Sequence, residues 1–494
     1  MAIRDGAAYT RSLRDGRTVF IDGKQVGDVT QHPAFRNAVA SFAKLYDFQA
    51  AAENRELMTV PANGARERVN RSWQLPRNHA DLVLRRRAIE TWSAQHLGFL
   101  GRSPDHLATT LGGMVMGLDV FRARSDDRAK ALADYFSYAR DNDLFVTYVI
   151  RNPQSDRSKG ASEQARDVVL RIVDEDASGI TVEGAKMLGT SSVMSDEILV
   201  AAIEPLKPGE ERYAVSFAMP LATRGVKLLS RRSYEAAAGA SFDYPLSTHF
   251  DENDAIVVFE NVKVPWERVF VAGDVDLARA QWHDTPAHVY QNYQSQIRLA
   301  TKLKFLVGLA RRVAQTNGVA DVPQVRSTLG RLAAQAAMVE GLVAGMEIEG
   351  REITGGYFVP SAPLLYAALS ITQELYPQIA MSIRELCGGG VIMLPSSVDD
   401  LANPIIRDAI AATQVSPVTD AMGRIGVMKL AWDALGSEFA SRHTQYEMFY
   451  GGATFVNHGN MVRTYDWRTA EALVDQALKL AGDVPAGVIS RTVA

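Results

Sequence analysis

The spacing of apolar residues changes twice along the chain, and these changes restrict the possible folds more than any other feature of the sequence. From about Pro33 to Asn142, apolar residues recur every three or four positions, as in AFRNAVASFAKLYDFQ, which is the spacing of an amphipathic helix. Near Leu144 this pattern gives way to short runs rich in β-branched residues, and from about Asp276 the helical spacing returns. The order of helices, strands and helices predicts an α+β fold with segregated layers.

The same pattern divides the chain into three predicted domains: an N-terminal helical domain at 1–146, a central antiparallel β domain at 147–275 and a C-terminal helical bundle at 276–494. About seven strand-like runs, among them LFVTYVI and AIVVFENVKV, fall in the central part and predict a sandwich or barrel. Four helices of twenty or more residues are expected in the last part, as a bundle requires. The last of them is predicted over GRIGVMKLAWDALGSEFASRHTQYEMF.

Composition excludes several classes of protein. With 494 residues, 47% of them hydrophobic, the chain can bury a large core without disulfides or a structural metal. The net charge of −4 favours neither a nucleic-acid nor a membrane partner, and no run reaches the roughly 18 apolar residues of a membrane span. Cys387 is the only cysteine, which excludes an iron–sulfur cluster, and no histidine has metal-binding spacing. We therefore expect a cytoplasmic protein without a metal.

A helix start is predicted in the segment GFLGRSPDHLATTLGG. Ser103 stands where an N-cap residue is expected, with Pro104 at the first helical position and Asp105 in the first turn. Arg102 and His106 then flank the helix N-terminus, where unpaired backbone N–H groups favour an anion such as a phenolate, carboxylate or phosphate. A capped surface helix with two exposed polar residues explains the same pattern. This motif alone therefore does not distinguish an anion-binding site from an ordinary surface helix.

Three other segments carry polar groups that could serve a flat ligand. A predicted strand contains Tyr148 and runs into RNPQSDRS, whose donors could hold a heterocycle and a pyrophosphate. Small residues around Thr190 permit close backbone approach, and a hydroxyl can bond a ring nitrogen. His283 and His288 lie at the entry to the predicted bundle. An ordinary polar loop, a strand end and packed histidines explain these segments equally well.

Several motifs together resemble the 4-hydroxyphenylacetate 3-monooxygenase family. They are YTRSLRDGRTVFIDGKQVGDVTQHPAFRNAVASFAKLYDFQ, GRSPDH, RNPQSDRS, FDYPLSTHFDENDAIVVFENVKVPWERVF, QIRLATKLKF, LPSS, KLAWDALGSEFASRHTQYE and MVR, in one order over essentially the whole chain. The resemblance implies an acyl-CoA-dehydrogenase-like subunit of a homotetramer. It also implies FAD, used as FADH2 from a separate NAD(P)H flavin reductase that delivers it by diffusion. The implied reaction uses O2 and transfers one oxygen atom from a flavin C4a-hydroperoxide to a small phenolic substrate.

The resemblance also implies which residues bind the substrate and take part in catalysis. Arg102 matches the family's phenol-binding arginine. The position four residues later is typically a tyrosine but is His106 here, and a histidine typical of the family is replaced by Tyr148. This exchange implies a phenol or related heteroaromatic other than 4-hydroxyphenylacetate. The further residues implied at the substrate are Ile203, Glu204 and His288.

A flavin site is implied by the same resemblance. Thr190 matches the residue beside flavin N5 and C4a, and the loop after Tyr148 matches the segment around the isoalloxazine and the ribityl chain. A loop at 203–212 matches a mobile substrate cover. The implied cofactor-binding residues are Tyr148, Val149, Ile150, Arg151, Gln154, Ser155, Asp156, Arg157, Thr190, Met461, Val462, Arg463 and Thr464.

Three other functions remain open on the sequence. In halophenol or nitrophenol monooxygenases of the same architecture, attack at a substituted carbon expels the substituent, and His288 or His283 could act as the base. Acyl-CoA dehydrogenation would need a catalytic carboxylate and a CoA channel, and neither is recognisable. A flavin-binding protein without turnover would also fit the departures from the family at His106 and Tyr148.

Overall fold

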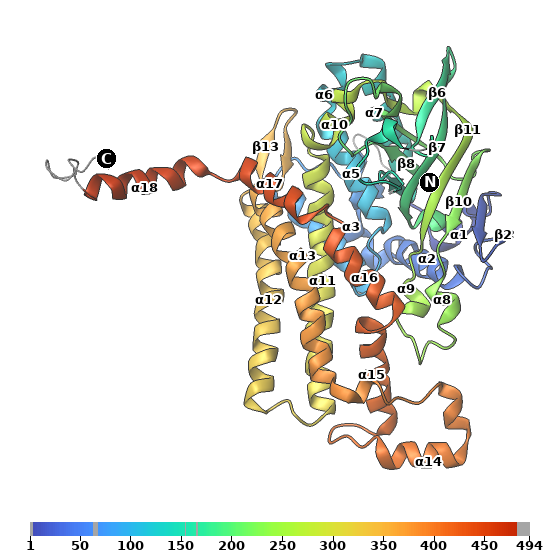
Figure 1. Ribbon diagram of the computed structural model, residues 1–494, viewed down its shortest axis with the longest axis vertical. Coiled ribbons are helices and arrows are strands. Elements are labelled where there is room, and N and C mark those ends of the chain that lie inside the picture. The colour runs from blue at the N-terminus through green and yellow to red at the C-terminus, as the bar shows by residue number, and fades with distance from the viewer. Residues whose placement is uncertain (1–2, 63–67, 154, 165, 482–494) are drawn as a thin grey trace, which may run out of the picture.

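The computed structural model describes residues 3–62, 68–153, 155–164 and 166–481. Figure 1 shows a β-rich region packed beside one end of a bundle of long helices, and a last helix that extends away from the body. The predicted order of helices, strands and helices is confirmed. None of the helices in the described ranges is long and apolar enough to cross a membrane.

The N-terminal part consists mainly of helices whose starts are set by local capping. Asn78 accepts a hydrogen bond from the Asp81 backbone at the start of one helix, and Ser125 accepts one from the Arg128 backbone at the start of another. The elements are α1 (Gly6–Ser12), α2 (Arg36–Ala50), α3 (Arg55–Met58), β3 (Thr59–Pro61), β4 (Arg68–Asn70), α4 (His79–Gln95), α5 (Pro104–Met116), α6 (Leu118–Arg122) and α7 (Asp126–Asp141).

Two sheets make up the β region, one with the strand order β2-β1-β10-β11-β7-β6 and one with the order β12-β9-β8-β5. Most neighbouring strands are antiparallel, as predicted, but β1 pairs with β10 and β5 with β8 in parallel. Parallel pairs need crossover connections, which the local apolar spacing does not reveal. The strands are β1 (Thr18–Ile21), β2 (Lys24–Val26), β5 (Val146–Val149), β6 (Arg171–Asp176), β7 (Gly179–Thr190), β8 (Glu197–Ala201), β9 (Val215–Pro220), β10 (Val226–Ser230), β11 (Asp254–Pro265) and β12 (Val269–Ala272).

The segment before Pro33 contributes β1 and β2 to the larger sheet, although the sequence predicted no strand there. Asp22 and Gly23 connect the two strands, and both have positive φ angles, of 51° and 75°. Positive φ at both central residues is the pattern of a type I′ hairpin turn, for which an Asp-Gly pair is a strong signal. The boundaries of the three predicted domains stay a prediction.

The last long helix predicted for the bundle is divided in the structure. α15 ends at Leu435 with Gly436 as its C-cap residue, and the Ser437 side chain accepts from the Ala440 backbone and thereby starts α16. The remaining elements are α8 (Tyr234–Ala237), α9 (Ser247–Phe250), α10 (Val275–His283), α11 (Ala287–Thr316), α12 (Pro323–Ile348), β13 (Arg351–Ile353), β14 (Tyr357–Val359), α13 (Ala362–Cys387), α14 (Pro404–Thr413), α15 (Ala421–Leu435), α16 (Glu438–Phe449), α17 (Thr454–Thr464) and α18 (Trp467–Ala481).

The three regions meet around the N-terminal end of α5. This helix packs against α11 of the bundle and against β5 of the smaller sheet. Side chains from all three regions can therefore approach one another at this place, and the polar residues singled out in the sequence lie there.

Candidate functional site

The predicted helix start is present, but its polar residues are buried. α5 begins at Pro104 with Ser103 at the N-cap position, although the Ser103 hydroxyl donates to Asp105 and does not cap the helix backbone. Arg102 is only 7% exposed, and His106 is fully buried. The alternative explanation of this motif, a surface helix with two exposed polar side chains, is therefore wrong.

The Arg102 guanidinium joins aromatic side chains from three parts of the chain. Nη1 donates to Tyr446 Oη (2.7 Å) and contacts His106 Nε2 (2.9 Å), while Nη2 donates to Tyr148 Oη (2.9 Å). Burial lowers the pKa of Arg102, but the two tyrosines and Glu252 outweigh this effect and hold the pKa above its usual value. Arg102 is therefore a permanent cation whose side-chain partners are neutral groups.

The contact with Arg102 determines the protonation of His106. A guanidinium can only donate, so His106 Nε2 accepts. Burial, followed by the positive charges of Arg102 and Arg298, lowers the pKa of His106 well below its ordinary value. The imidazole is thus neutral and carries its proton on Nδ1, which is buried and has no hydrogen-bond partner among the residues described. A buried donor without a partner is costly, so this N–H is suited to bind a ligand.

Tyr148 lies on β5, and its hydroxyl oxygen accepts a second hydrogen bond. The donor is Gln291 Nε2 on α11 (3.1 Å), and Gln291 in turn accepts from the Thr110 hydroxyl (3.1 Å). Because Arg102 and Gln291 occupy both lone pairs of the oxygen, the Tyr148 hydroxyl keeps its own proton to donate. Arg102 and Tyr148 together present a cation and a neutral donor, which is an arrangement suited to a phenol or phenolate oxygen, while the His106 Nδ1–H is directed to the other side of its ring.

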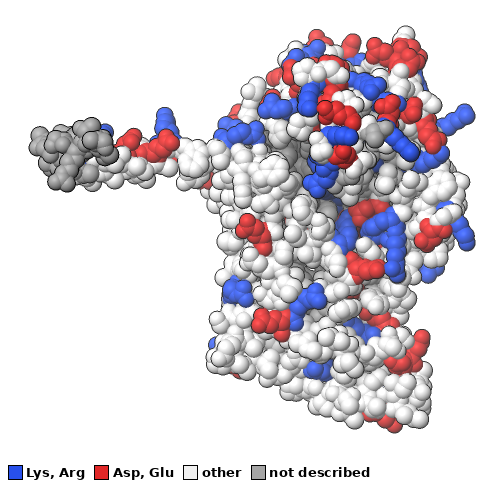
Figure 2. Space-filling view, in the orientation of Figure 1, with Lys and Arg blue, Asp and Glu red and all other residues white. Residues whose placement is uncertain are grey.

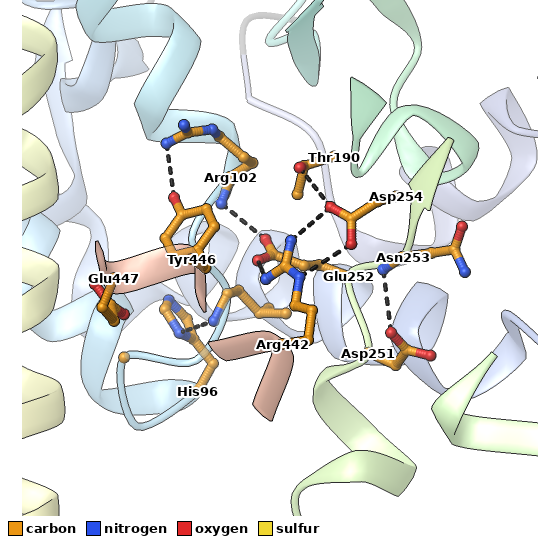
Figure 3. Close-up of polar contacts among 12 residues, drawn as sticks. His96, Arg102, Thr190, Asp251, Glu252, Asn253, Asp254, Arg442, Tyr446 and Glu447 are labelled. Carbon is orange, nitrogen blue, oxygen red and sulfur yellow. Dashed lines mark hydrogen bonds and ion pairs between the residues drawn. The ribbon is translucent and has the colours of Figure 1, made fainter. Parts of the chain in front are cut away.

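Thr190 ends β7, and its hydroxyl is bound by a carboxylate. Thr190 and Asp254 face each other across β7 and β11, and Thr190 Oγ1 donates to Asp254 Oδ1 (2.6 Å). Arg442 on α16 donates to both oxygens of Asp254 and to Glu252 Oε1 (2.6 Å). Glu252 Oε2 accepts from the backbone N–H of Arg102 (2.9 Å). Figure 3 shows these contacts, which connect Arg102 to Thr190.

The predicted flavin loop and the predicted substrate cover are bonded to each other. Glu204 Oε1 accepts from the Asn152 backbone (3.0 Å) and lies 3.3 Å from Arg151 Nε. Lys186 is buried and donates to Asn152 Oδ1 (2.7 Å). Burial and Arg151 lower the pKa of Lys186 to about 8, against the opposing effect of Glu204. Ile203 packs at the edge of the apolar cluster that surrounds β5.

Other predicted flavin residues lie at the end of β5 and along the loop that follows it. Val149 is fully buried, and Ile150 is 7% exposed, so mainly their backbone could reach a ligand. Asp156 accepts from the Ser158 hydroxyl (2.6 Å) within its own loop, while Ser155 and Arg157 are exposed. Gln154 lies outside the described residues.

The C-terminal residues predicted to bind flavin lie on α17. Met461, Val462, Arg463 and Thr464 belong to this helix, which packs against α13. Val462 is 61% exposed, and Arg463 donates to Asn460 Oδ1. The hydrogen bonds of the described residues do not connect these four side chains to Arg102 or Thr190. Their role at the cofactor stays a prediction.

His288 lies near a different set of rings. It stacks on Tyr366 with a centroid distance of 5.7 Å, and the ring centroid of His283 is 5.4 Å away. Burial, then His283 and Arg463, lower the pKa of His288 to about 3. In the described part of the chain, His288 forms hydrogen bonds with Tyr366 and Asn292 and makes no direct contact with the Arg102 cluster.

Comparison with known proteins identifies the family of this chain. Residues 5–271 match the family described as 4-hydroxyphenylacetate 3-hydroxylase N terminal, and residues 278–479 match its C terminal counterpart. The chain belongs to the 4-hydroxyphenylacetate 3-hydroxylase family. The pyoverdin chromophore biosynthetic protein of Pseudomonas aeruginosa is 37% identical over 91% of this chain and 89% of its own length. The 4-nitrophenol 2-monooxygenase oxygenase component of a Rhodococcus species is 36% identical over 90% of this chain and 86% of its own length.

A solved structure of the same family has the same fold. The oxygenase component of 4-hydroxyphenylacetate 3-monooxygenase, crystallised with FAD and 4-hydroxyphenylacetate, superposes with a TM-score of 0.91 at 30% identity. The match covers 97% of this chain and 99% of that structure. The family predicted from the sequence motifs is thus confirmed, and with it the assignment to the oxygenase components of flavin-dependent aromatic monooxygenases. The names of the relatives show that members of the 4-hydroxyphenylacetate 3-hydroxylase family differ in substrate.

Four of the residues that form this site were not singled out in the sequence analysis. They are Asp254, Gln291, Arg442 and Tyr446. Asp254 lies in the motif FDENDAIV and the last two lie in SRHTQYE, so the motifs that indicated the family contain three of them. No group of three or more His, Cys, Asp or Glu side chains placed to hold a metal occurs in the described ranges.

Proposed function

We propose that this chain is the oxygenase component of a two-component monooxygenase that hydroxylates a phenol or a related aromatic ring. The observation that carries the proposal is the buried cation Arg102, whose guanidinium donates to the neutral side chains of Tyr446, His106 and Tyr148. No carboxylate forms an ion pair with the Arg102 guanidinium within the described part of the chain. A buried charge without an ionic partner is costly, so an anionic ligand such as a phenolate is favoured there.

Arg102 and Tyr148 would act on the phenol oxygen. The Arg102 cation and the Tyr148 O–H stabilise negative charge on that oxygen and so favour the phenolate, whose proton is released to water. His106 holds the guanidinium through Nε2, and its Nδ1–H points to the other side of the ring, where it can bind another polar group of the ligand. Deprotonation makes the ring more electron-rich and more reactive toward an electrophilic oxygen. In comparable oxyanion sites, one such donor contributes about 2.7–4 kcal/mol of transition-state stabilisation. His106 and Tyr148 therefore belong with Arg102 as proposed catalytic residues.

FAD is the proposed cofactor, in its reduced form, and it supplies the electrons for activation of O2. We place it beside Thr190, with the loop from Tyr148 to Arg157 and the segment Met461–Thr464 as further contacts. Arg231 and Arg442, which hold the carboxylate bonded to Thr190, also line a pocket of about 500 Å³. Figure 2 shows charged side chains and a hollow on this face, where the β region meets the bundle. Thr190 is not among the lining residues, so the pocket supports the proposal only through these two arginines, which hold the carboxylate bonded to Thr190.

A second candidate is oxygenation with release of a nitro or halogen substituent. It is favoured by the 36% identity to an oxygenase component named for 4-nitrophenol. The proposed base for that chemistry, His288, has its pKa lowered to about 3, which makes it a weak base at neutral pH. Release of nitrite or halide from substituted phenols would favour this candidate, and simple ring hydroxylation would favour the first.

Homotetramer formation is also proposed, with exposed apolar surfaces as its support. α18 extends from the body in Figure 1, and Trp467, Leu473, Leu478 and Leu480 are each at least 48% exposed. Figure 2 shows that the face of the long helices below the β region carries few charged residues. Contiguous exposed apolar surface is typical of protein interfaces. A second copy of the chain is the proposed occupant.

The proposed function is tested with purified protein, a flavin reductase, NADH, FAD and a panel of phenols. We also propose a cytoplasmic location, because that is where NAD(P)H and the flavin reductase would be available. Formation of a hydroxylated product at the expense of NADH and O2 supports the proposal. If hydrogen peroxide were the only product with every phenol, the chain would be a flavin-binding protein without turnover. If neither oxidised nor reduced FAD bound, the cofactor assignment itself would fail.

A further inference from the structure

The hydrogen bond between Thr190 and Asp254 has a defined direction. Four donors surround the Asp254 carboxylate: the Thr190 hydroxyl (2.6 Å), Arg442 Nη2 (2.6 Å) and Nε (3.0 Å), and Arg231 Nε (2.8 Å). Burial opposes ionisation of Asp254, but Arg442 and Arg231 outweigh it and hold its pKa well below the ordinary value. An ionised carboxylate can only accept. The Thr190 proton is therefore committed to Asp254, and only the lone pairs of the Thr190 oxygen remain for a ligand.

This direction matches one redox state of a flavin and not the other. The N5 atom of a reduced flavin carries a hydrogen and donates, whereas N5 of an oxidised flavin has a lone pair and accepts. A threonine hydroxyl usually rotates to serve either partner. Here the carboxylate prevents that rotation, so Thr190 pairs with the reduced form only.

We propose that Asp254 is a positioning residue that fixes the Thr190 hydroxyl as an acceptor for the N5–H of reduced flavin and thereby makes the site selective for FADH2. This inference rests on the proposed function, because it places a flavin beside Thr190. The same carboxylate is held by Arg442, which also binds Glu252, the acceptor for the Arg102 backbone N–H (Figure 3). Asp254 thus fixes the cofactor contact within the network that also holds the substrate arginine.

The first test measures the dissociation constants of oxidised FAD and, anaerobically, of FADH2. Their ratio in the wild-type protein is compared with the ratio in Thr190→Val, which removes the hydroxyl and leaves the ion pairs of Asp254 in place. One neutral hydrogen bond predicts a loss of selectivity for FADH2 of about threefold to tenfold. Thr190→Ser is the matched control because it keeps the hydroxyl, and it should keep the wild-type ratio within twofold. An unchanged ratio in Thr190→Val would overturn the inference.

The second test examines Asp254 itself. In Asp254→Asn the amide can donate to Thr190, which frees the hydroxyl to serve oxidised N5, and this reorientation by itself lowers the preference for FADH2 by about tenfold. For a two-electron couple this corresponds to a midpoint potential of the bound flavin that is lower by about 30 mV. In the Thr190→Val background the same charge is lost but no hydroxyl can reorient, so the effects of Asp254→Asn in the two backgrounds should differ by about tenfold. An equal effect in both backgrounds would refute the role assigned to Thr190.

A third measurement needs no substitution, so it decides the direction even if Asp254→Asn does not fold. Oxidised 5-deaza-FAD has a C–H group in place of N5 and cannot accept a hydrogen bond there. Because the wild-type Thr190 hydroxyl should not donate to N5, the wild-type protein should bind FAD and 5-deaza-FAD with equal affinity within twofold. Tighter binding of FAD by threefold or more would contradict the proposal. Loss of binding of every flavin by the wild-type protein would instead refute the proposed function.

Discussion

Glu447→Gln is expected to destabilise the protein strongly, because Glu447 is the anion of a buried cluster of three charges. Glu447 accepts from Arg298 through both oxygens, with an Nη2–Oε2 distance of 2.8 Å, and Lys302 Nζ lies 3.0 Å from Oε1. The three side chains are at most 1% exposed. The substitution keeps the shape of the side chain but leaves two cations buried without an anion.

The size of this effect follows from the pKa of the carboxyl group. Burial raises the pKa of Glu447, but Arg298 and Lys302 outweigh it and lower the pKa from 4.5 to about 2. That difference corresponds to about 3 kcal/mol of stabilisation, which is present above pH 4.5 and is lost as the pH falls toward 2. Removing one partner of a buried ion pair costs about 3–5 kcal/mol in general. We therefore expect a loss of about 3–5 kcal/mol at pH 7.

The pH dependence of the variant provides a second check. Burial lowers the pKa of Lys302 to about 8 in the native protein even though Glu447 opposes this effect. Without Glu447, the folded-state pKa falls further, so between pH 7 and pH 9 the unfolded chain binds more protons at Lys302 than the folded chain does. The contribution of Lys302 to the free energy of unfolding therefore rises with pH in this range. The deficit of the variant relative to the wild-type protein should therefore be smaller at pH 9 than at pH 7.

Urea unfolding at both pH values measures the two effects. Asp134→Asn is the matched control, because Asp134 pairs with Lys130 on the surface and both side chains are more than 60% exposed. This control should change the free energy of unfolding by less than about 0.5 kcal/mol. If Glu447→Gln lowered the free energy of unfolding at pH 7 by less than about 1 kcal/mol, the Glu447 carboxylate would not be needed to stabilise the two buried cations, and the reasoning would be refuted.

Three other predictions concern the proposed site and assembly. Arg102→Ala should leave the affinity for FAD within twofold but lower the amount of product per FADH2 consumed, measured against peroxide formation, because the cation at the phenol oxygen is lost. His106→Phe keeps a ring but removes the unpaired Nδ1–H, and kcat/KM for the phenol should fall by about 10²-fold in steady-state assays. Deletion of the residues after Asp466 removes α18 and should reduce the molar mass measured by light scattering, whereas an unchanged mass would exclude α18 from the interface.

The fold was largely predictable because helices and strands bury apolar residues with different periods. The errors arose where single residues decide the local structure. Asp22 and Gly23 form a two-residue turn in a segment too short to show a clear period. Gly436 and Ser437 interrupt a helical pattern that continues on both sides of them, and only the capping chemistry of Ser437 indicates the break.

The site was predictable only in its local parts. Arg102 and His106 are four residues apart, so one motif contains both. Tyr446 and Gln291 reach the same site from helices that lie far away in the sequence, and their positions depend on how the bundle packs against α5. Spacing within one segment contains no information about such contacts. Family resemblance supplied Thr190, but the partner that orients its hydroxyl became visible only in the structure.

The charges of the site are arranged so that one cation is left for the ligand. Among the described residues, Arg442 pairs with Glu252 and Asp254, and Arg231 pairs with Asp251 and Asp254. Arg102 is bound to this group only through its backbone N–H, while its guanidinium contacts neutral rings. A carboxylate paired directly with the guanidinium would cancel the charge that a phenolate needs. Placing the carboxylates behind the backbone keeps the arginine in position and leaves its charge for the substrate, while the same carboxylates orient the hydroxyl proposed to face the flavin.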